Sequence, residues 1–134
     1  MNDNFIKQCE ASEEIQREYI PIWSFVLVKP CWAVNIITQG VVTCAANEPR
    51  YCDVFMNGNQ CGGIEMKDII YLPTQEQLQS LLNITDWQIM FKKFRYFYKY
   101  ATVDNIFLMN ELWLAFVMYE KYNKIWNGEK WEAI

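Results

Sequence analysis

The ten residues FKKFRYFYKY, from Phe91 to Tyr100, place basic and aromatic side chains next to one another. Lysine and arginine attract phosphate groups, and tyrosine rings can stack on unpaired bases. Residues 85–101 carry four basic side chains and one acidic side chain, whereas residues 1–84 and 102–134 are both net acidic. The segment is therefore a candidate binding surface for a nucleic acid or for a protein partner.

Two tryptophans near the C-terminus form a second candidate surface, since tryptophan is enriched where a few side chains carry most of a binding energy. Trp126 and Trp131 straddle an Asn-Gly pair. From both segments, the expected partner-binding residues are Lys92, Lys93, Arg95, Tyr96, Lys99, Tyr100, Trp126 and Trp131. The plain alternative is structural: a core helix with a basic outer face, and two indoles that clamp the C-terminus over the helices.

Thiol chemistry is a third possibility, because the chain has five cysteines: Cys9, Cys31, Cys44, Cys52 and Cys61. Their number is odd, no two form a C-x-x-C pair, and no histidine is present to complete a zinc site. Free cysteine packs as a small apolar side chain. We therefore expect buried, reduced thiols and no metal or cofactor.

Catalytic groups are sparse. The absence of histidine removes the usual general base and the Ser-His and Cys-His nucleophile pairs. Gly62-Gly63 lacks the lysine and the spacing of a phosphate-binding loop. A carboxylate pair such as Glu65 and Asp68 is expected to be solvated surface charge, because a catalytic pair needs a cleft. We expect no catalytic residues and no enzyme.

The elements that position these residues predict a single α+β domain over residues 1–134, with a small antiparallel sheet flanked by helices. A first helix, capped by Asn2 or Asp3 and ended by Pro21, is expected to run to about Tyr19. Its weakly apolar stripe is Phe5, Cys9, Ser12, Ile15 and Tyr19. Short β-branched and aromatic runs between Trp23 and Leu72, separated by turn residues, predict the antiparallel strands.

Three further helices are expected after Leu72. Thr74 with Gln77, and Thr85 with Gln88, match capping boxes that start the first two. The first of the three presents Leu78, Leu81 and Leu82, and the second, from about Asp86 to Ala101, presents a face of Trp87, Met90, Phe91, Phe94 and Tyr98. The third, from about Asn110 to Asn123, contains LWLAFVMY, which is apolar nearly all round and is expected to be the centre of the core.

Two Asn-Gly pairs predict type I′ hairpin turns. The turn at Asn57-Gly58 would place Val54 opposite Cys61.

The turn at Asn127-Gly128 would place Trp126 opposite Glu129 and Lys124 opposite Trp131. Both indoles would then project from one face on a diagonal. Because an isolated hairpin is marginal in water, we expect this one to rest on the body of the protein.

The longest apolar helical run is far shorter than the roughly 20 residues of a membrane span. The N-terminal MNDNFIKQCEASEE is charged and lacks the apolar stretch of a signal peptide. We expect a protein of the cytoplasm.

Three stretches together resemble a family: FIKQCEASEEIQREYIP, IIYLPTQEQLQSLL and ELWLAFVMYEKYNKIWNGEKWE. The chain resembles small uncharacterised proteins encoded by phages and prophages of Gram-positive bacteria, over about half of its length. Residues 30–66 depart from the family pattern. The resemblance brings no catalytic or binding residues with it. It implies a phage accessory protein that acts in the cytoplasm of the bacterial host.

Taken together, these observations favour a non-enzymatic binding protein that acts on a host or phage protein. Inhibition of a host anti-phage defence, as anti-CRISPR proteins do, is the leading specific case, by analogy with other small phage proteins. Two alternatives stay open. The first is nucleic-acid binding through residues 91–100, and the second is sequestration of a nucleotide-like small ligand in an aromatic-lined pocket.

Overall fold

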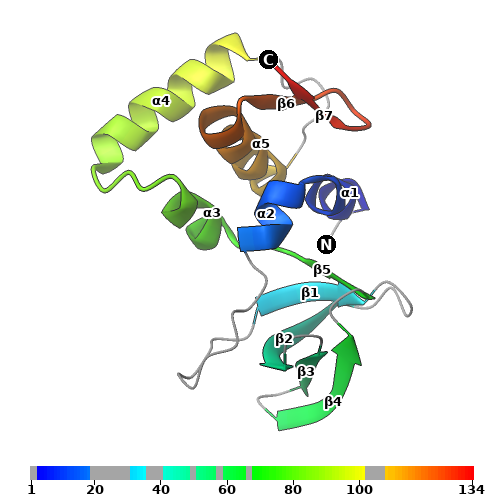
Figure 1. Cartoon of the computed structure of the whole chain (residues 1–134). Coiled ribbons are helices and arrows are strands. Elements are labelled where there is room, and N and C mark those ends of the chain that lie inside the picture. The colour runs from blue at the N-terminus through cyan, green and yellow to red at the C-terminus, as the bar shows by residue number, and fades with distance from the viewer. Residues whose placement is uncertain are drawn as a thin grey trace. The chain divides into compact units, whose positions relative to one another are not determined.

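The computed structural model describes residues 3–18, 31–35, 41–48, 51–56, 59–65, 68–101 and 108–134. The α+β class is confirmed (Figure 1). The elements are α1 (Asp3–Ala11), α2 (Glu13–Glu18), β1 (Cys31–Asn35), β2 (Val41–Glu48), β3 (Tyr51–Met56), β4 (Asn59–Glu65), β5 (Ile69–Tyr71), α3 (Gln75–Leu81), α4 (Trp87–Tyr100), α5 (Met109–Tyr122), β6 (Lys124–Trp126) and β7 (Trp131–Ala133).

These elements form two compact units. The helical unit comprises Met1–Ala11 and Thr74–Ile134, and the sheet unit comprises Ser12–Pro73. The expectation of a single domain stays a prediction.

The sheet unit contains the expected antiparallel sheet, in which the described residues form five strands in the order β4-β3-β2-β1-β5. Most of the apolar runs between Trp32 and Leu72 therefore formed strands as expected. The first run, residues 23–29, lies outside the described residues.

The pairing of β3 with β4 departs from the expected register. Phe55 is opposite Gln60, but Val54 is opposite Gly62, because the register shifts between Val54 and Phe55. Cys61 is the extra residue of this β-bulge. The expected pairing of Val54 with Cys61 was therefore wrong. The Asn57-Gly58 turn itself lies outside the described residues.

The side chain of Gln16 ties α2 to β5. Its Nε2 donates to the carbonyl oxygen of Tyr71 at 2.9 Å, and its Oε1 accepts from the Tyr71 backbone N–H at 2.9 Å. The next residue, Leu72, donates its N–H to the carbonyl oxygen of Trp32 in β1. Main-chain groups alternate in direction along a strand, so the outward-facing groups of Tyr71 are those that Gln16 satisfies.

Replacing Gln16 by alanine should lower the free energy of unfolding by about 1–3 kcal/mol. Two part-buried hydrogen bonds are lost, and the N–H and the carbonyl of Tyr71 lose the partner that Gln16 provided. Hydrogen exchange at the Tyr71 amide should accelerate in the same variant. Gln16→Glu is the matched control, because at neutral pH its carboxylate has no proton to donate to the Tyr71 carbonyl oxygen. The stability that Gln16→Glu loses should become smaller below about pH 4, where the protonated carboxyl can donate this hydrogen bond. Unchanged exchange in Gln16→Ala would contradict the assignment.

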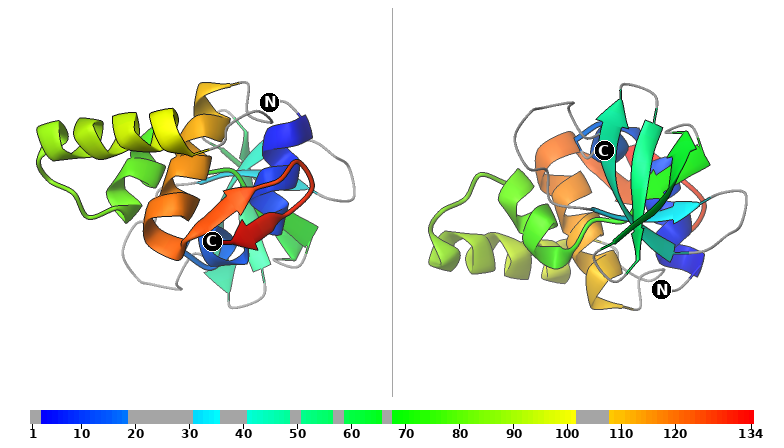
Figure 2. Two further views of the ribbon diagram at one scale, coloured as in Figure 1. Left: turned by 90° about the horizontal axis from the view of Figure 1, so that it is seen from above. Right: turned by 90° about the horizontal axis from the view of Figure 1, so that it is seen from below.

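The helical unit is built around α5, as expected. Residues Trp113 to Met118 are all buried, and the flanking Leu112 and Tyr119 are half-buried. α5 packs against α1, α3, α4 and β6, which Figure 2 shows from two sides. An apolar helix of this kind needs neighbours on several sides, and these four elements supply them.

The other helices follow the sequence in part. The capping box of Thr74 and Gln77 is present at α3, which buries Leu78. The single N-terminal helix was expected to reach about Tyr19, but it is divided at Ser12 into α1 and α2. Its stripe is nevertheless buried at Phe5, Cys9, Ser12 and Ile15. Residues 19–21, the expected end of this helix, lie outside the described residues.

Candidate partner-binding surface on α4

Helix α4 begins at a side-chain cap different from the expected one. The carboxylate of Asp86 accepts a hydrogen bond from the Gln88 backbone N–H at 2.9 Å. The expected capping box of Thr85 and Gln88 was therefore wrong by one residue, because Asp86 takes the cap position itself. At the other end, the Ala101 N–H still bonds to the Phe97 carbonyl.

The side of α4 that faces α5 is defined by Phe97. This ring is 2% exposed, and Met90 and Phe94 beside it are half-buried. With about 100° of rotation per residue, both lie within about 60° of Phe97 around the helix axis. This is the inner face of α4.

An aromatic cluster fixes that face against α5. The Phe94 ring stacks on Trp113 with centroids 4.6 Å apart, and lies edge-on to Phe116 at 5.1 Å. The Phe97 ring contacts Phe116 at 5.4 Å and Tyr119 at 5.2 Å. Such contacts hold the helix in one orientation.

The expected apolar face of α4 was wrong for three of its five residues. Trp87, Phe91 and Tyr98 are exposed. The buried face is rotated toward Phe97, a residue that the sequence interpretation left out. One signal for this was present: Lys92, Arg95 and Lys99 recur at intervals of three and four residues, so they mark a solvent-facing row and place Phe97 opposite it.

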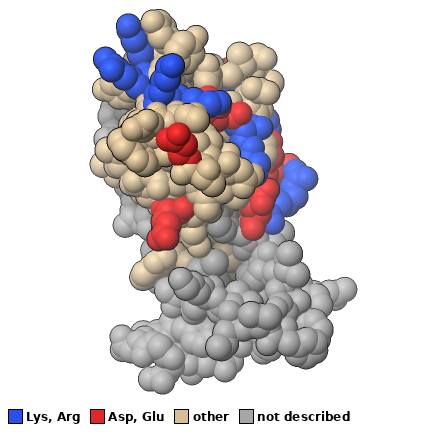
Figure 3. Space-filling view, turned by 90° about the vertical axis from the view of Figure 1, so that its left-hand side faces the viewer, with Lys and Arg blue, Asp and Glu red and all other residues tan. Residues whose placement is uncertain are grey.

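We call Lys92, Arg95 and Lys99 the outer row of α4. All three are exposed, and they lie about 160 to 220° from Phe97 around the axis. Within the described part of the chain, Lys92 and Arg95 form no ion pair. Figure 3 shows Lys and Arg side chains gathered in the upper part of the face that carries α4.

Two apolar flanks border the outer row. The first flank is Trp87, Phe91 and Tyr98, and the second flank is Ile89, Tyr96 and Tyr100. Each of the six side chains is between 49% and 65% exposed. At about 100° per residue, the two flanks lie on opposite sides of the helix.

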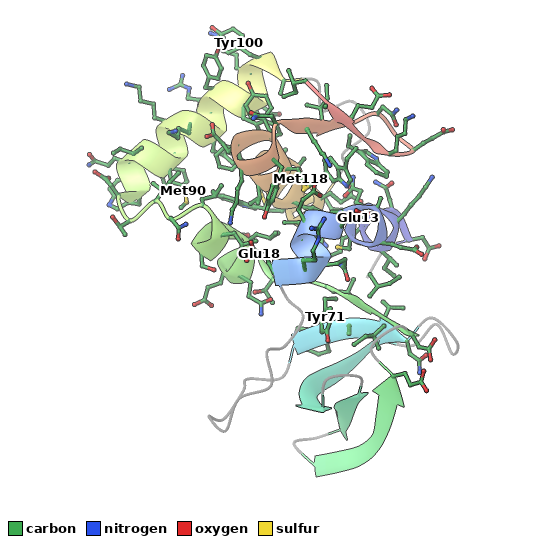
Figure 4. The ribbon with its side chains drawn as sticks, viewed as in Figure 1. Glu13, Glu18, Tyr71, Met90, Tyr100 and Met118 are labelled. Carbon is green, nitrogen blue, oxygen red and sulfur yellow. The ribbon has the colours of Figure 1, made fainter. Side chains whose placement is uncertain are left out.

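Figure 4 shows the contrast between an exposed and a buried side chain of the helical unit. Tyr100 lies at the end of α4, and Met118 belongs to the buried part of α5.

Ring contacts within each flank restrict the exposed side chains. Trp87 and Phe91 meet edge-on with centroids 5.8 Å apart. Tyr96 and Tyr100 are 4.6 Å apart, and Lys99 Nζ lies 5.2 Å from the Tyr100 ring centre. Side chains already held in place lose less entropy when a partner binds.

The fourth expected basic residue, Lys93, lies apart from the outer row. Its Nζ forms a salt bridge with Glu120 of α5 at 3.4 Å. Lys93 is at about 40° from Phe97, so it borders the inner face. The structure thus brings Lys92, Arg95, Tyr96, Lys99 and Tyr100 together on the outside of α4, whereas Lys93 contacts α5.

The C-terminal tryptophans occupy a different environment. Trp126 is buried at 5% exposure, and it pairs with Trp131 directly across the β6–β7 hairpin. Their rings are 5.1 Å apart. Trp131 is half-buried and its Nε1 donates to the Gln8 carbonyl oxygen in α1 at 3.0 Å. These contacts support the clamp interpretation.

The expected register of this hairpin was wrong. Trp126 is opposite Trp131, Lys124 is opposite Ala133, and the loop has four residues between the strands. The Oδ1 atom of Asn127 accepts from the backbone N–H groups of Glu129 and Lys130 at 2.8 and 2.9 Å. This side chain organises a longer loop than the two-residue type I′ turn.

Cys9 is the one cysteine whose side chain the structure describes. It is fully buried in α1, and burial raises the pKa of its thiol well above the ordinary value, because the charged form loses its hydration. Such a thiol is inert, as expected for a structural cysteine. Among the other four, Cys31 and Cys44 are register partners, which the sequence interpretation did not foresee.

The buried Cys9 thiol predicts a stability that falls at alkaline pH. Above about pH 8.5, the ordinary pKa of cysteine, the unfolded chain loses a proton that the folded chain keeps. Stability then falls by about 1.4 kcal/mol per pH unit. The free energy of unfolding of Cys9→Ala, measured in urea between about pH 8 and 10, should not show this part of the decrease with pH. Identical slopes in the two proteins would contradict the assignment.

The described residues lack two further kinds of feature, a metal-binding cluster and a membrane-spanning helix. No group of three or more Cys, Asp or Glu side chains there is placed to hold a metal ion. Among the helices of the described ranges, none combines the length and apolar character that a membrane crossing requires. Comparison of the chain with protein-family models, curated proteins and solved structures found no match.

Proposed function

We propose that this chain is a non-enzymatic binding protein that acts on a host or phage protein, with the outside of α4 as its interface. The observation that carries the proposal is the exposure of both apolar flanks on one helix, α4. Contiguous exposed apolar side chains commonly mark a protein interface. Tryptophan, tyrosine and arginine, all present here, are also the residues most enriched at binding hot spots.

The phage setting rests on the sequence resemblance. In that setting, the specific case that we favour is inhibition of an anti-phage defence in the cytoplasm of a Gram-positive host. Stoichiometric binding suits such a role, since an inhibitor that occupies a surface of its target needs no catalytic group. The exposed flanks supply a surface of the required kind.

Nucleic-acid binding is the second candidate. It is favoured by the exposed outer row beside Tyr96 and Tyr100, because cations can track phosphates while rings stack on bases. On this alternative, log affinity should fall linearly with log salt.

The experiment compares three forms of the tagged chain in cells that carry its gene. Phe91→Ala with Tyr98→Ala removes two rings of the first flank. Met109→Ala is the matched control, since Met109 is also 60% exposed but lies on α5. Pull-down with quantitative mass spectrometry should recover one stoichiometric protein with the wild type and the control. The flank variant should bind it roughly a hundredfold less, as expected for the loss of two hot-spot rings.

A second readout addresses the proposed role in defence. Expression of the wild type in a defence-bearing host should raise the plating efficiency of a sensitive phage, and the flank variant should not. Circular dichroism should be the same for all three forms. Recovery of no stoichiometric protein, or equal recovery with the flank variant, would contradict the proposal.

A further inference from the structure

The order of side chains around α4 limits the kind of surface that can receive this helix. The outer row, Lys92, Arg95 and Lys99, projects farthest from α5, and an apolar flank lies on each side of it. A surface in contact with the whole of this face must present negative charge at the centre and apolar groups on both sides.

A DNA major groove has the opposite arrangement. Its walls are phosphates and its floor is formed by base edges. A helix in that groove therefore needs cations on its flanks, where α4 carries Trp87, Ile89 and Phe91. Apolar side chains against phosphates would lose hydration without a compensating contact.

A single nucleic-acid strand also fits poorly. The two flanks lie on opposite sides of a helix that is about 10–12 Å wide with its side chains. Bases of one strand can stack on one flank, but the outer row then separates them from the other flank. The second set of exposed apolar side chains would stay in water.

We propose that the partner of α4 is a protein groove with an acidic floor and apolar walls. This inference rests on the proposed function and specifies the partner's chemistry. A groove that receives one α-helix is a recurring mode of protein recognition. The outer row spans Lys92 to Lys99, about 10 Å along the axis, so carboxylates on the floor should recur at about 5 Å, one helical turn.

Electrostatics and apolar burial then act together in this groove. The floor carboxylates pair with Lys92, Arg95 and Lys99, while the walls bury the rings of both flanks. Paired charges that lose water contribute strongly to specificity, because a wrong partner leaves them unpaired. Arg95 can also bind a carboxylate through two parallel hydrogen bonds.

The test uses the full chain with the photoreactive amino acid benzoylphenylalanine in place of one exposed residue. It is placed at Tyr98 in the first flank, at Tyr96 in the second flank, or at Met109 as a position outside α4. Irradiation in cells that carry the gene should crosslink the same protein from positions 98 and 96, but not from 109. Mapped crosslinks should fall on two sides of an acidic groove.

A charge test is combined with these crosslinks. The triple variant Lys92→Glu, Arg95→Glu and Lys99→Glu reverses the outer row, and its adduct yield should fall roughly tenfold or more. The matched control, with equal change in net charge, is the triple variant Lys7→Glu, Lys121→Glu and Lys130→Glu. These three residues are exposed elsewhere in the helical unit, so its adduct yield should be unchanged.

The remaining outcomes separate this inference from the proposed function. Full crosslinking in the outer-row variant would overturn the acidic floor, and crosslinks from one flank alone would overturn the groove, while protein binding by α4 would stand in both cases. The chain should also be tested for binding to a labelled thymidine strand or duplex of about 20 nucleotides. Binding that depends on salt and is lost in the outer-row variant would favour nucleic-acid binding over both the acidic groove and the proposed function. No adduct at any position would overturn the proposed function itself.

Discussion

Phe116→Ala should lower the free energy of unfolding by about 3–5 kcal/mol, a large share of the roughly 5–15 kcal/mol typical of a domain. Phe116 is fully buried, and its ring meets Phe94, Phe97 and Trp113 with centroids 5.1 to 5.8 Å apart. Truncation leaves a cavity that these large rings cannot fill without leaving their contacts with one another. Urea unfolding followed by circular dichroism measures the loss.

The matched control for this prediction is Phe91→Ala. The same residue type is 57% exposed at Phe91 on α4, so its truncation leaves no internal cavity. It should cost less than about 1 kcal/mol. Equal losses for Phe116→Ala and Phe91→Ala would contradict the assignment of inner and outer faces to α4, and with it the proposed interface.

Trp126→Ala should cost a similar amount, about 3–5 kcal/mol. The indole is buried in the hairpin of the helical unit, where its ring lies 5.1 Å from that of Trp131 and β6 packs against α5. Without it, the hairpin loses its main apolar contact, and two strands alone are marginal in water. Hydrogen exchange should then become fast at the amides of β6 and β7, together with the loss in urea unfolding.

Two phenylalanine variants separate the apolar and polar parts of this clamp. The Nε1 of Trp126 is buried and has no hydrogen-bond partner in the part of the chain that the structure describes, so Trp126→Phe should cost less than about 2 kcal/mol. Trp131→Phe removes the bond to the Gln8 carbonyl oxygen and should cost about 1 kcal/mol. Fast hairpin exchange in Trp126→Phe, equal to that in Trp126→Ala, would contradict the clamp.

The core helix was predictable from sequence because its pattern leaves one solution. LWLAFVMY is apolar on all sides, so only burial on several sides stabilises it as a helix, whatever its neighbours are. The capping box of Thr74 and Gln77 was predictable for a similar reason, since both of its hydrogen bonds are local. In both cases the residues that determine the feature lie within the segment that forms it.

The buried face of α4 was not predictable in this way. The helix carries seven aromatic residues, more than one inner face can hold. Which of them are buried depends on where Trp113 and Phe116 of α5 lie, and no pattern within α4 contains that information. The candidate basic residues were found from composition, together with Tyr96 and Tyr100 of the second flank. The first flank was missed because Trp87, Phe91 and Tyr98 were assigned to the buried face.

The prediction of the β6–β7 hairpin register was wrong for a different physical reason. An Asn-Gly pair favours a two-residue turn, but the Asn127 side chain stabilises a four-residue loop, and direct pairing of Trp126 with Trp131 brings the two rings together. The bulge at Cys61 similarly shifts by one residue the four pairings of β3 with β4 that run from Val54–Gly62 to Tyr51–Glu65. One additional residue in a loop or strand changes every later cross-strand partner.

The two hydrogen bonds from Gln16 to Tyr71 have a consequence for self-association. Among the described strands, β5 is the last on its side of the sheet. Unpaired backbone groups on such an edge strand can recruit another polypeptide, which is how many folded proteins begin to aggregate. The primary amide of Gln16 occupies both groups of Tyr71 in the manner of a neighbouring peptide unit. A second chain would have to displace it before it could extend the sheet beyond β5.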